Sequence, residues 1–457
     1  MARDTTDERP IETKSQLVDW LAVGCKPKSD WRIGTEHEKF AFYRDSHKPV
    51  PYGGDKGIRA ILEGMQKKLG WEPIVDDGNL IGLFEKNGQG AISLEPGGQF
   101  ELSGAPVETL HQTCSESNRH LDMVKAVADD LGIGFLGLGG SPIWTFDETP
   151  RMPKSRYEIM TNFMPKVGDQ GHDMMYRTCT IQVNLDFDSE RDMVRKLQTS
   201  LKLQGMASAL FANSPFTEGK PNGFLSWRSD IWRDTDNQRG GYHAFMLDKG
   251  FSFESYVDWA LDVPMYFVIR DGHYHDCTHV TFRQFMDGAL KGEVSDPEPT
   301  VGDWSNHMTT VFPDVRLKRF LEMRGADGGR WRKICALPAF WVGLLYSSPS
   351  LDAAEELISD WTPEMVFDLR EAVPKEGLRA KIAGKELLGF AKEILEISRL
   401  GLVERARLNG EGFDETVHLA PLQETVASGM TPADLLLQKY NGEWNESLDS
   451  LFTEYAF

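Results

Sequence analysis

The stretch from Arg177 to Phe187, RTCTIQVNLDF, alternates strictly between polar and apolar residues over its last ten positions. The odd positions are apolar and the even positions are polar: Cys179, Ile181, Val183, Leu185 and Phe187 against Thr178, Thr180, Gln182, Asn184 and Asp186. Because successive side chains of a strand point to opposite faces, the pattern predicts a β-strand with one packed face and one face open to water or to a ligand.

Two other stretches have the same division. In VRLKRFLEMRG, residues 315–325, the even positions carry Arg316, Lys318, Glu322 and Arg324, and the odd positions are mostly apolar, which predicts a further strand. The opening candidate strand, RIGTEHEKF, places Glu36 and Glu38 on one face. Further strands are expected within residues 79–86, 91–96, 99–104, 132–140 and 264–272.

Helical periodicity separates these strands. It predicts helices over 107–131, 190–212 and 336–347, a short helix near 15–23 with Ser15 as a possible cap, and a mostly helical portion from about 350 to 457. No internal repeat or low-complexity linker divides the chain. We therefore expect one α+β domain over 1–457, although the helical tail could equally form a small separate lobe.

Composition excludes several classes of partner. The chain has 457 residues, 70 of them acidic and 50 basic, for a formal net charge of -20, which disfavours binding to nucleic acid or to an anionic membrane surface. The first residues lack the apolar core of a signal peptide, and no apolar run approaches about 20 residues, so a cytoplasmic location is expected. Five cysteines without CxxC spacing argue against a zinc site or a secreted disulfide framework.

The polar strand faces are rich in oxygen ligands. A solvated sheet face is the simplest explanation for any single strand. Several strands together, however, supply carboxylate and amide oxygens suited to hard divalent cations such as Mg²⁺: Glu36, Glu38, Glu95, Glu101, Gln182, Asn184 and Glu322. Glu36 and Glu38 lie roughly 7 Å apart on the pleat, a spacing that suits ligands of two neighbouring ions. No GxxxxGK[ST] loop is present, so any phosphates would be bound by metals and arginines.

Long motifs give the chain a family resemblance. RIGTEHEKF, ISLEPGGQFELSGAP, YRTCTIQVNLDF, ALFANSPF and RLKRFLEMRGADGGRWRKICALPAFWVGLL resemble the plant-type glutamate-cysteine ligases, which plants share with many proteobacteria. The resemblance implies a glutamine-synthetase-like fold, a curved and mostly antiparallel sheet with helices on its outer side. It also implies ATP- and Mg²⁺-dependent joining of the L-glutamate γ-carboxylate to the L-cysteine amine through γ-glutamyl phosphate.

The same resemblance assigns residues. It implies two or three Mg²⁺ ions, with ligands Glu36, Glu38, Glu95, Glu101, Gln182 and Glu322. Arg228 and Arg324 become catalytic candidates, and Arg228, Tyr266, Arg324 and Trp331 become candidates for the glutamate and phosphate pocket, with Arg324 also contacting the nucleotide. Cys114 and Cys335 occupy the positions of a disulfide found in this group. A monomer or a homodimer is expected.

Other interpretations stay open at this point. A related carboxylate-amine ligase could use a different amine, a guanidino kinase could share a comparable sheet, and a binding protein could retain a degenerate ligase fold. The segment DGHYHDCTH offers His273, His275, Cys277 and His279 at spacings that a soft metal could use, although a wet strand end is the simpler interpretation.

Overall fold

An open antiparallel sheet forms the centre of the molecule. The computed structural model describes residues 4–86 and 90–457. Within them the sheet runs in the order β14-β15-β7-β1-β5-β4-β3-β2, and β6 pairs with the far half of β1. Its nine strands are β1 (Ile33–Tyr43), β2 (Glu72–Asp76), β3 (Asn79–Phe84), β4 (Ala91–Leu94), β5 (Phe100–Ser103), β6 (Ile133–Leu136), β7 (Thr180–Leu185), β14 (Val315–Leu317) and β15 (Leu321–Asp327). The α+β class and the antiparallel sheet expected from the sequence are confirmed.

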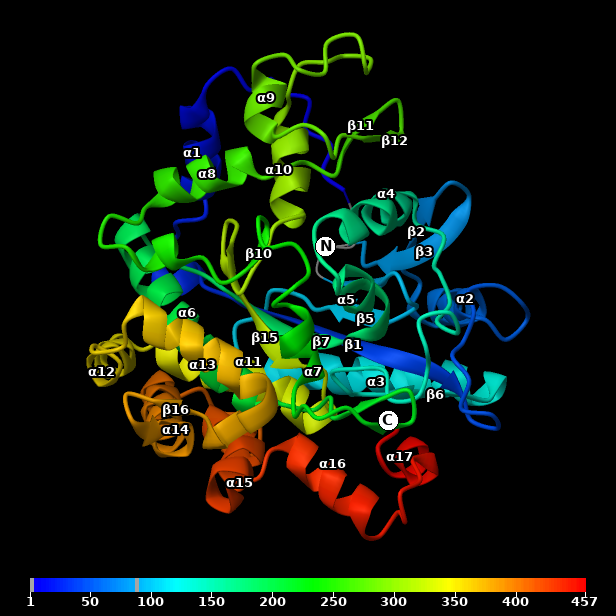
Figure 1. Cartoon of the computed structure of the whole chain (residues 1–457), viewed down its shortest axis with the longest axis vertical. Helices are drawn as coiled ribbons and strands as arrows, with labels where there is room; N and C mark the ends of the chain where they lie inside the picture. Colours follow the sequence, from blue (N-terminus) through cyan, green and yellow to red (C-terminus); the bar gives the residue numbers. More distant parts are fainter. Residues whose placement is uncertain (1–3, 87–89) are drawn as a thin grey trace.

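Helices form much of the remaining chain (Figure 1). They are α1 (Lys14–Ala22), α2 (Ile58–Leu69), α3 (Leu110–Leu131), α4 (Ser155–Phe163), α5 (Gly171–Arg177), α6 (Glu190–Leu210), α7 (Trp227–Ile231), α8 (Phe253–Asp262), α9 (Phe282–Met286), α10 (Val301–Thr309), α11 (Trp331–Leu345), α12 (Ser348–Leu357), α13 (Pro363–Glu376), α14 (Leu387–Arg405), α15 (Ala420–Ser428), α16 (Pro432–Asn441) and α17 (Asp449–Glu454). Among the short elements, β11 (Phe267–Arg270) pairs with β12 (His273–Asp276), and the 3-10 helix η5 (Glu415–Leu419) precedes α15.

The apolar face of the sheet packs against helices. Ile181, Val183 and Leu185 of β7 belong to one buried cluster with side chains of α6, α11 and α14. Residues of β3, β4 and β5 form a second cluster with α2 and α3. The polar face therefore points the other way, toward α4, α5 and α7, which lie in front of the sheet in Figure 1.

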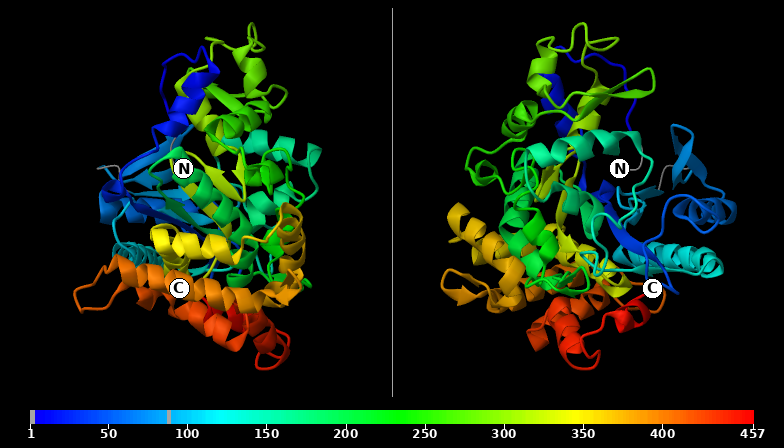
Figure 2. Two further views of the ribbon diagram at one scale, coloured as in Figure 1. Left: turned by 90° about the vertical axis from the view of Figure 1, so that its left-hand side faces the viewer. Right: turned by 45° about the vertical axis from the view of Figure 1, so that its right-hand side comes forward.

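The C-terminal helices gather at one end of the molecule, in orange and red in Figure 2. They are not isolated from the sheet, because Leu387, Ile394 and Leu422 share the buried cluster that contains β7. Helix α14 crosses α11 closely at Gly343 and Gly401, where a Cβ added to Gly401 would lie 1.9 Å from the Gly343 carbonyl oxygen. Glycine at this crossing allows the two helix backbones to approach.

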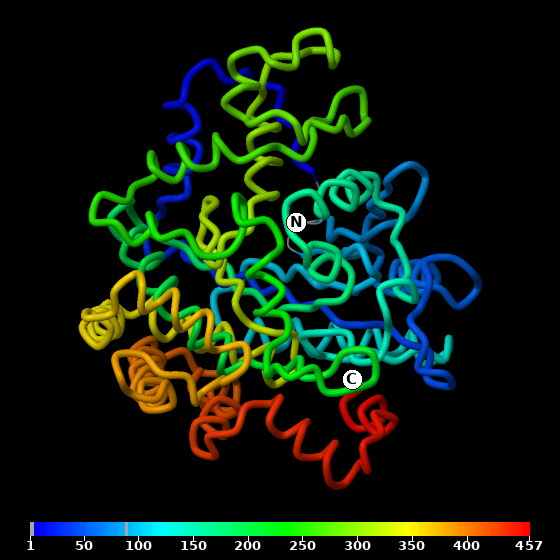
Figure 3. Tube along the Cα trace, in the orientation of Figure 1, coloured from blue at the N-terminus to red at the C-terminus, as the bar shows by residue number. Residues whose placement is uncertain are grey.

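The N-terminal segment runs along α8 and α10, as the tube in Figure 3 shows. Ile11 N donates to Pro299 O at 2.9 Å, and Val301 N donates to Arg9 O at the same distance. Helix α1 begins at Lys14 after Thr13, so Ser15 lies inside the helix and the expectation of a cap at Ser15 is wrong.

The segment 315–325 differs from its expected form. It is a tight hairpin, with β14 and β15 joined through residues 318–320, and not one continuous strand. The turn contains no Gly, Pro, Asn or Asp, so the sequence gives no turn signal there. Arg316 pairs directly with Glu322 across the hairpin, which keeps the even residues on one face as expected.

In the described part of the chain, no single helix is long and apolar enough to span a membrane, whereas α11 and α12, joined by a 90° bend, pass that test as a pair on length and composition.

Candidate active site

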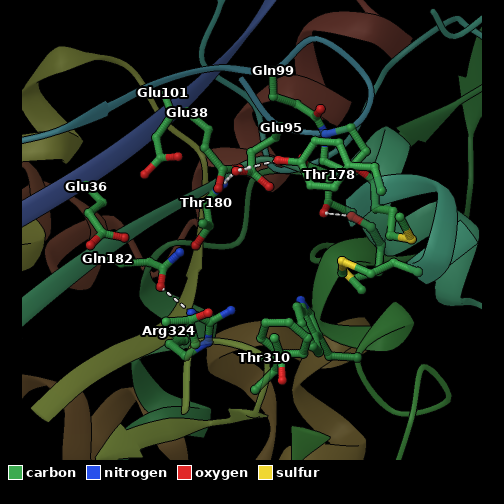
Figure 4. Close-up of a pocket in the computed structure, with 18 of the residues that line it drawn as sticks. Glu36, Glu38, Glu95, Gln99, Glu101, Thr178, Thr180, Gln182, Thr310 and Arg324 are labelled. Atoms are coloured by element: carbon green, nitrogen blue, oxygen red, sulfur yellow. Dashed lines mark hydrogen bonds between the residues drawn. The ribbon is translucent and has the colours of Figure 1, made fainter. Parts of the chain in front are cut away.

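A cavity of about 920 Å³, open mouth included, lies over the polar face of the sheet (Figure 4). Its walls come from the sheet and from α4, α5, α7 and α10. The charged and amide side chains that line it are Glu36, Glu38, Glu95, Gln99, Glu101, Arg156, Gln182, Arg228, Arg316 and Arg324. The fold thus brings together seven of the residues singled out from the sequence: Glu36, Glu38, Glu95, Glu101, Gln182, Arg228 and Arg324.

Glu38, Glu95 and Glu101 form the acidic end of this cavity. Antiparallel pairing places Glu38 of β1 opposite Glu101 of β5, and Glu95 follows β4 directly. Glu101 accepts hydrogen bonds from the hydroxyls of Ser93 (2.6 Å) and Ser103 (2.7 Å). Strand register therefore gathers carboxylates from three neighbouring strands.

The polar contacts of Glu38 and Glu95 come from neutral groups. Thr180 N donates to Glu38 Oε2 at 3.0 Å, and the Tyr157 hydroxyl lies 3.3 Å from Glu95 Oε1. Over residues 4–86 and 90–457, no ion pair involves any carboxylate of the acidic end. The acidic end thus carries negative charge without a bonded cation.

Burial and the neighbouring charges set the pKa values of these carboxylates. Burial and the neighbouring Glu95 and Glu101 raise the pKa of Glu38 well above its usual range. Burial and Glu101 also raise the pKa of Glu95. Burial acts in the same direction on Glu101, but its two serine hydrogen bonds and Lys154 help to hold its pKa below the ordinary value. A divalent cation would remove the mutual repulsion, because it stabilises the ionised forms.

Oxygen donors at the acidic end fit Mg²⁺. Hard divalent cations prefer carboxylate oxygens and keep several waters, and the cavity is open to solvent. Glu36 lies two residues along β1, opposite Gln182 of β7, and its Oε1 accepts from Asn184 Nδ2 at 2.9 Å. Asn184 Oδ1 is buried and has no hydrogen-bond partner among the described residues. A second oxygen-rich position therefore adjoins the acidic end.

Glu322 has different surroundings. It is fully buried, and its two oxygens are bound by Arg316 (2.7 Å), Lys318 (2.7 Å) and Arg324. Burial acts to raise its pKa, but these three cations hold the pKa well below the usual range. Glu322 does not line the cavity. The ligand role expected for Glu322 stays a prediction, and metal binding there would require at least one of these cations to move.

A β-bulge positions Arg324. The register of β15 against β7 shifts between Met323 and Ala326, so Arg324 and Gly325 together face the position of Gln182. Bulges redirect side chains and are common beside functional sites. Arg324 Nη1 donates to Gln182 Oε1 at 2.6 Å and also contacts Glu322. The oxygen of Gln182 is therefore occupied by a guanidinium group, while Arg324 faces the acidic end across the cavity (Figure 4).

Arg228 closes the wall next to Arg324. It lies on α7, whose first turn is capped by Ser226, and its Nη2 donates to the Arg324 carbonyl oxygen at 3.0 Å. Burial lowers its pKa, although Asp327 and Glu38 oppose that effect. Both arginines thus present positive charge opposite the carboxylates.

Two residues expected in the pocket lie elsewhere. Tyr266 is buried behind the cavity wall, with its ring 3.8 Å from the Arg239 guanidinium. Trp331 is 44% exposed at the start of α11 and does not line the cavity. Neither side chain therefore forms part of the cavity surface, because Tyr266 packs into an apolar cluster and Trp331 lies at the exposed start of α11.

Several lining residues were not singled out from the sequence. The sequence did indicate Arg316 as a polar-face residue, because it has the same even numbering as Glu322 in the stretch 315–325. It was not assigned a role at the site. Arg156 and Tyr157 belong to α4, which folds back over β4 through contacts distant in sequence, such as Tyr157 to Leu94 O at 2.7 Å. No local pattern in the sequence indicates that approach.

The cysteines and the histidine segment have separate places. Cys114 of α3 and Cys335 of α11 form a disulfide with their Cα atoms 5.6 Å apart. His273 and His275 lie on β12, Cys277 is buried, and His279 contacts Glu293 at 3.0 Å. Within the described residues these side chains do not converge on a common point suited to a metal.

Comparison with known proteins agrees with this geometry. The family model described as glutamate-cysteine ligase family 2 matches residues 32–454. The chain is 55% identical over 445 residues to glutamate-cysteine ligase A, chloroplastic, of Oryza sativa subsp. indica, covering 97% of this chain and 88% of the relative. It is 54% identical over 448 residues to the chloroplastic glutamate-cysteine ligase of Arabidopsis thaliana, covering 97% and 83%.

A solved structure supports the fold. The crystal structure of glutamate-cysteine ligase from Francisella tularensis in complex with AMP aligns with a TM-score of 0.52, covering 93% of this chain and 89% of that one, at 12% sequence identity. At this identity the likeness concerns the fold alone.

The plant relatives contradict the expected location and confirm the family resemblance. Both are named chloroplastic, which contradicts the cytoplasmic location expected from the N-terminal residues. Identity above 50% over nearly the whole chain, together with a family match over residues 32–454, confirms the resemblance found in the motifs. The chain belongs to the glutamate-cysteine ligase family 2.

Proposed function

We propose that this protein joins the γ-carboxylate of L-glutamate to the amine of L-cysteine at the expense of ATP, which is the first step of glutathione synthesis. Family membership and the names of the plant relatives support the activity. The single structural observation that supports it best is a cavity that gathers Glu38, Glu95 and Glu101 at one end and has Arg324 facing them across it. Such a polarity suits a metal-bound polyphosphate.

The reaction itself requires both ends. A carboxylate is a poor electrophile, so the γ-carboxylate of glutamate first takes the γ-phosphoryl group of ATP and becomes an acyl phosphate. The amine of cysteine then attacks the acyl carbon, the amide bond forms as inorganic phosphate leaves, and the amine loses a proton. Phosphoryl transfer spreads negative charge over the equatorial oxygens, and positioned cations stabilise that charge. We assign this role to Arg324 and Arg228, with Arg316 and Arg156 as further cations on the cavity wall.

We propose Glu36, Glu38, Glu95 and Glu101 as the metal-binding residues, for two or three Mg²⁺ ions. When bound, Mg²⁺ neutralises the polyphosphate and aligns it for transfer. Glu38, Glu95 and Glu101 form one group of ligands, and Glu36 lies beside it next to Gln182. Glu322 instead orients Arg316 and Arg324, so its contribution to catalysis is through those side chains.

We also propose that residues 1–457 act as one catalytic domain, as a monomer or a homodimer. The shared buried cluster of β7, α11 and α14 supports this, because separating the C-terminal helices would expose a large apolar surface.

The test is ADP release by the full-length protein with ATP, Mg²⁺, glutamate and a panel of amines, with the product identified by mass spectrometry. We expect γ-glutamylcysteine to form only when glutamate and cysteine are both present. ADP released equally without cysteine, or only with another amine, would overturn the proposal and would favour a related carboxylate-amine ligase. Denatured protein and a Glu38→Gln variant serve as controls.

A further inference from the structure

A second cluster of potential metal ligands surrounds the disulfide, on the helical side of the sheet. His111 and Cys114 lie in the first turns of α3, Cys335 lies near the start of α11, and His418 lies on η5. The ligand atoms of Cys114, Cys335 and His418 all lie within 4.8 Å of one another. Within the described residues, this cluster contains no carboxylate ligand, unlike the acidic end of the cavity.

We propose that reduction of the Cys114–Cys335 disulfide creates a binding site for a soft divalent cation such as Zn²⁺, with the two thiolates and His418 Nδ1 as ligands. Disulfide and metal are alternative links between the same helices, one for oxidising and one for reducing conditions. The cluster lies apart from the cavity, and metal binding there does not depend on the proposed activity.

The geometry already approaches that of a zinc site. Cys114 Sγ lies 3.4 Å from His418 Nδ1. With Zn–S near 2.3 Å and Zn–N near 2.05 Å, a tetrahedral ion holds its sulfur and nitrogen ligands about 3.5 Å apart. The two sulfur atoms move apart on their own once the covalent bond is broken. Three protein ligands leave the fourth position to water.

The hydrogen-bond chain of the histidines selects the required tautomer. His418 Nε2 lies 3.0 Å from His111 Nδ1, and His111 Nε2 lies 3.3 Å from Arg407 O. Because the carbonyl oxygen can only accept, His111 Nε2 carries a hydrogen, its Nδ1 accepts, and His418 Nε2 donates. This leaves the lone pair of His418 Nδ1 facing the sulfur of Cys114. A donor contact of this kind from the second ring nitrogen is common for metal-bound histidines.

The protein holds His418 in place without help from the disulfide. Glu415, which is fully buried on η5, accepts from Leu110 N at 2.7 Å and pairs with Arg405 at 2.9 Å. These contacts fix η5 against the start of α3. The third ligand thus stays beside Cys114 when the disulfide opens.

An open hollow lies beside the histidines of the cluster. It is lined by Thr109, His111, Gln112 and residues 408–410. His111 forms part of its wall and is hydrogen-bonded to His418, so only one side chain separates the hollow from this ligand.

The chemistry balances with an external thiol as reductant. Two thiol molecules supply two electrons and two protons, the disulfide becomes two thiols, and the reductant becomes a disulfide. Binding of the divalent cation then displaces one proton from each thiol, so two protons are released per ion.

The test uses Co²⁺ as a spectroscopic probe of the full-length protein. Protein reduced with a phosphine under argon and exchanged into metal-free buffer is titrated with Co²⁺. We expect a thiolate-to-cobalt charge-transfer band that saturates at one ion per chain and is displaced by Zn²⁺. Oxidised protein should give no such band. The band reports thiolate ligands only, because Co²⁺ bound by the carboxylates of the cavity gives none. Absence of the band in fully reduced protein would therefore overturn the proposal.

Variants then identify the ligands. His111→Ala removes the hydrogen-bond partner of a ligand and should weaken Co²⁺ affinity by about 10-fold to 100-fold. His418→Ala removes a ligand while both cysteines stay in place, so its loss of affinity should be larger. His279→Ala and Cys25→Ser are matched controls, because His279 is exposed and Cys25 is a free thiol outside the cluster, and both should leave affinity unchanged. Unchanged affinity in a folded His418→Ala protein, verified by its thermal transition, would rule out His418 as a ligand and overturn the site.

Discussion

Glu38 and Glu322 lie on the polar face of the same sheet but in opposite electrostatic surroundings. Glu322 is bound by Arg316, Lys318 and Arg324, and its pKa is held well below the ordinary value. Among the described residues Glu38 forms no ion pair, and burial together with Glu95 and Glu101 raises its pKa well above the ordinary value although Arg228 acts in the opposite direction. The difference shows that neighbouring charge, more than burial, decides whether a carboxylate here stabilises the fold or attracts a cation.

The largest effect should come from Glu322→Gln. Removing this carboxylate leaves Arg316, Lys318 and Arg324 close together and uncompensated, and breaking a buried ion pair in this way costs about 3 to 5 kcal/mol. Urea unfolding measures the loss. The control is Glu396→Gln, which breaks an exposed pair with Arg399 and should cost less than about 1 kcal/mol. Equal losses in the two variants would contradict the contrast between Glu322 and Glu38.

Glu38→Gln should lower activity without lowering stability, in contrast to Glu322→Gln. We expect kcat to fall by more than about 100-fold, since changes one layer further from a metal already cost 10-fold to 100-fold. The free energy of unfolding in metal-free buffer should stay the same or rise, because a repulsive charge is lost. Glu72→Gln, on the exposed edge strand β2, is the control and should keep both values. A Glu38→Gln protein with full activity would remove Glu38 from the ligand set.

Mg²⁺ should stabilise the wild-type protein through the acidic end. At 100 times its dissociation constant, an ion that binds only the folded state adds about 2.7 kcal/mol to the free energy of unfolding. Thermal unfolding with and without Mg²⁺ measures this gain. We expect the gain to be much smaller in Glu38→Gln and unchanged in Glu72→Gln. Equal stabilisation of all three proteins would place the ion elsewhere.

The smallest effect should be the change in the free energy of unfolding per pH unit in the metal-free protein. The folded-state pKa of Glu38 is raised, so its contribution to stability is present below the unfolded pKa and is lost as pH rises toward the folded pKa. The pKa of Glu322 is lowered, so its contribution is present above the unfolded pKa and is lost as pH falls through the folded value.

Urea unfolding at a series of pH values, in the presence of a chelator, measures how the free energy of unfolding changes with pH through Glu38 and through Glu322. From about pH 4.3 upward, Glu38 should reduce the free energy of unfolding by up to about 1.4 kcal/mol per pH unit. Glu38→Gln should flatten that decline, whereas Glu72→Gln should not. A decline of the same slope in Glu38→Gln would show that other groups cause it.

Much of the fold could be predicted because its signals are local. The alternation in residues 177–187 predicted β7, and helical periodicity predicted α3 and α6 to within a few residues. The hairpin of 315–325 was missed because its turn has no residue that favours turns. Even so, Arg316 and Glu322 lie on the same face of the hairpin as expected, because they pair directly across it.

The membership of the cavity was predicted less completely. Glu36, Glu38, Gln182 and Arg324 lie on strands whose polar faces are visible in the sequence. Arg156 and Tyr157 come from a helix that reaches the cavity only through tertiary packing. Tyr266 and Trp331 were assigned by resemblance, and the fold places both outside the cavity wall.

The sequence by itself determined which strand faces are polar and that they are rich in glutamate, because side-chain direction along a strand depends only on position. Tertiary structure decided which glutamates have cations beside them, because strand order places Arg316 and Lys318 at Glu322 and leaves Glu38 beside Glu101. It also decided that His418 lies against Cys114, since charge compensation and metal geometry depend on distances between residues far apart in the chain.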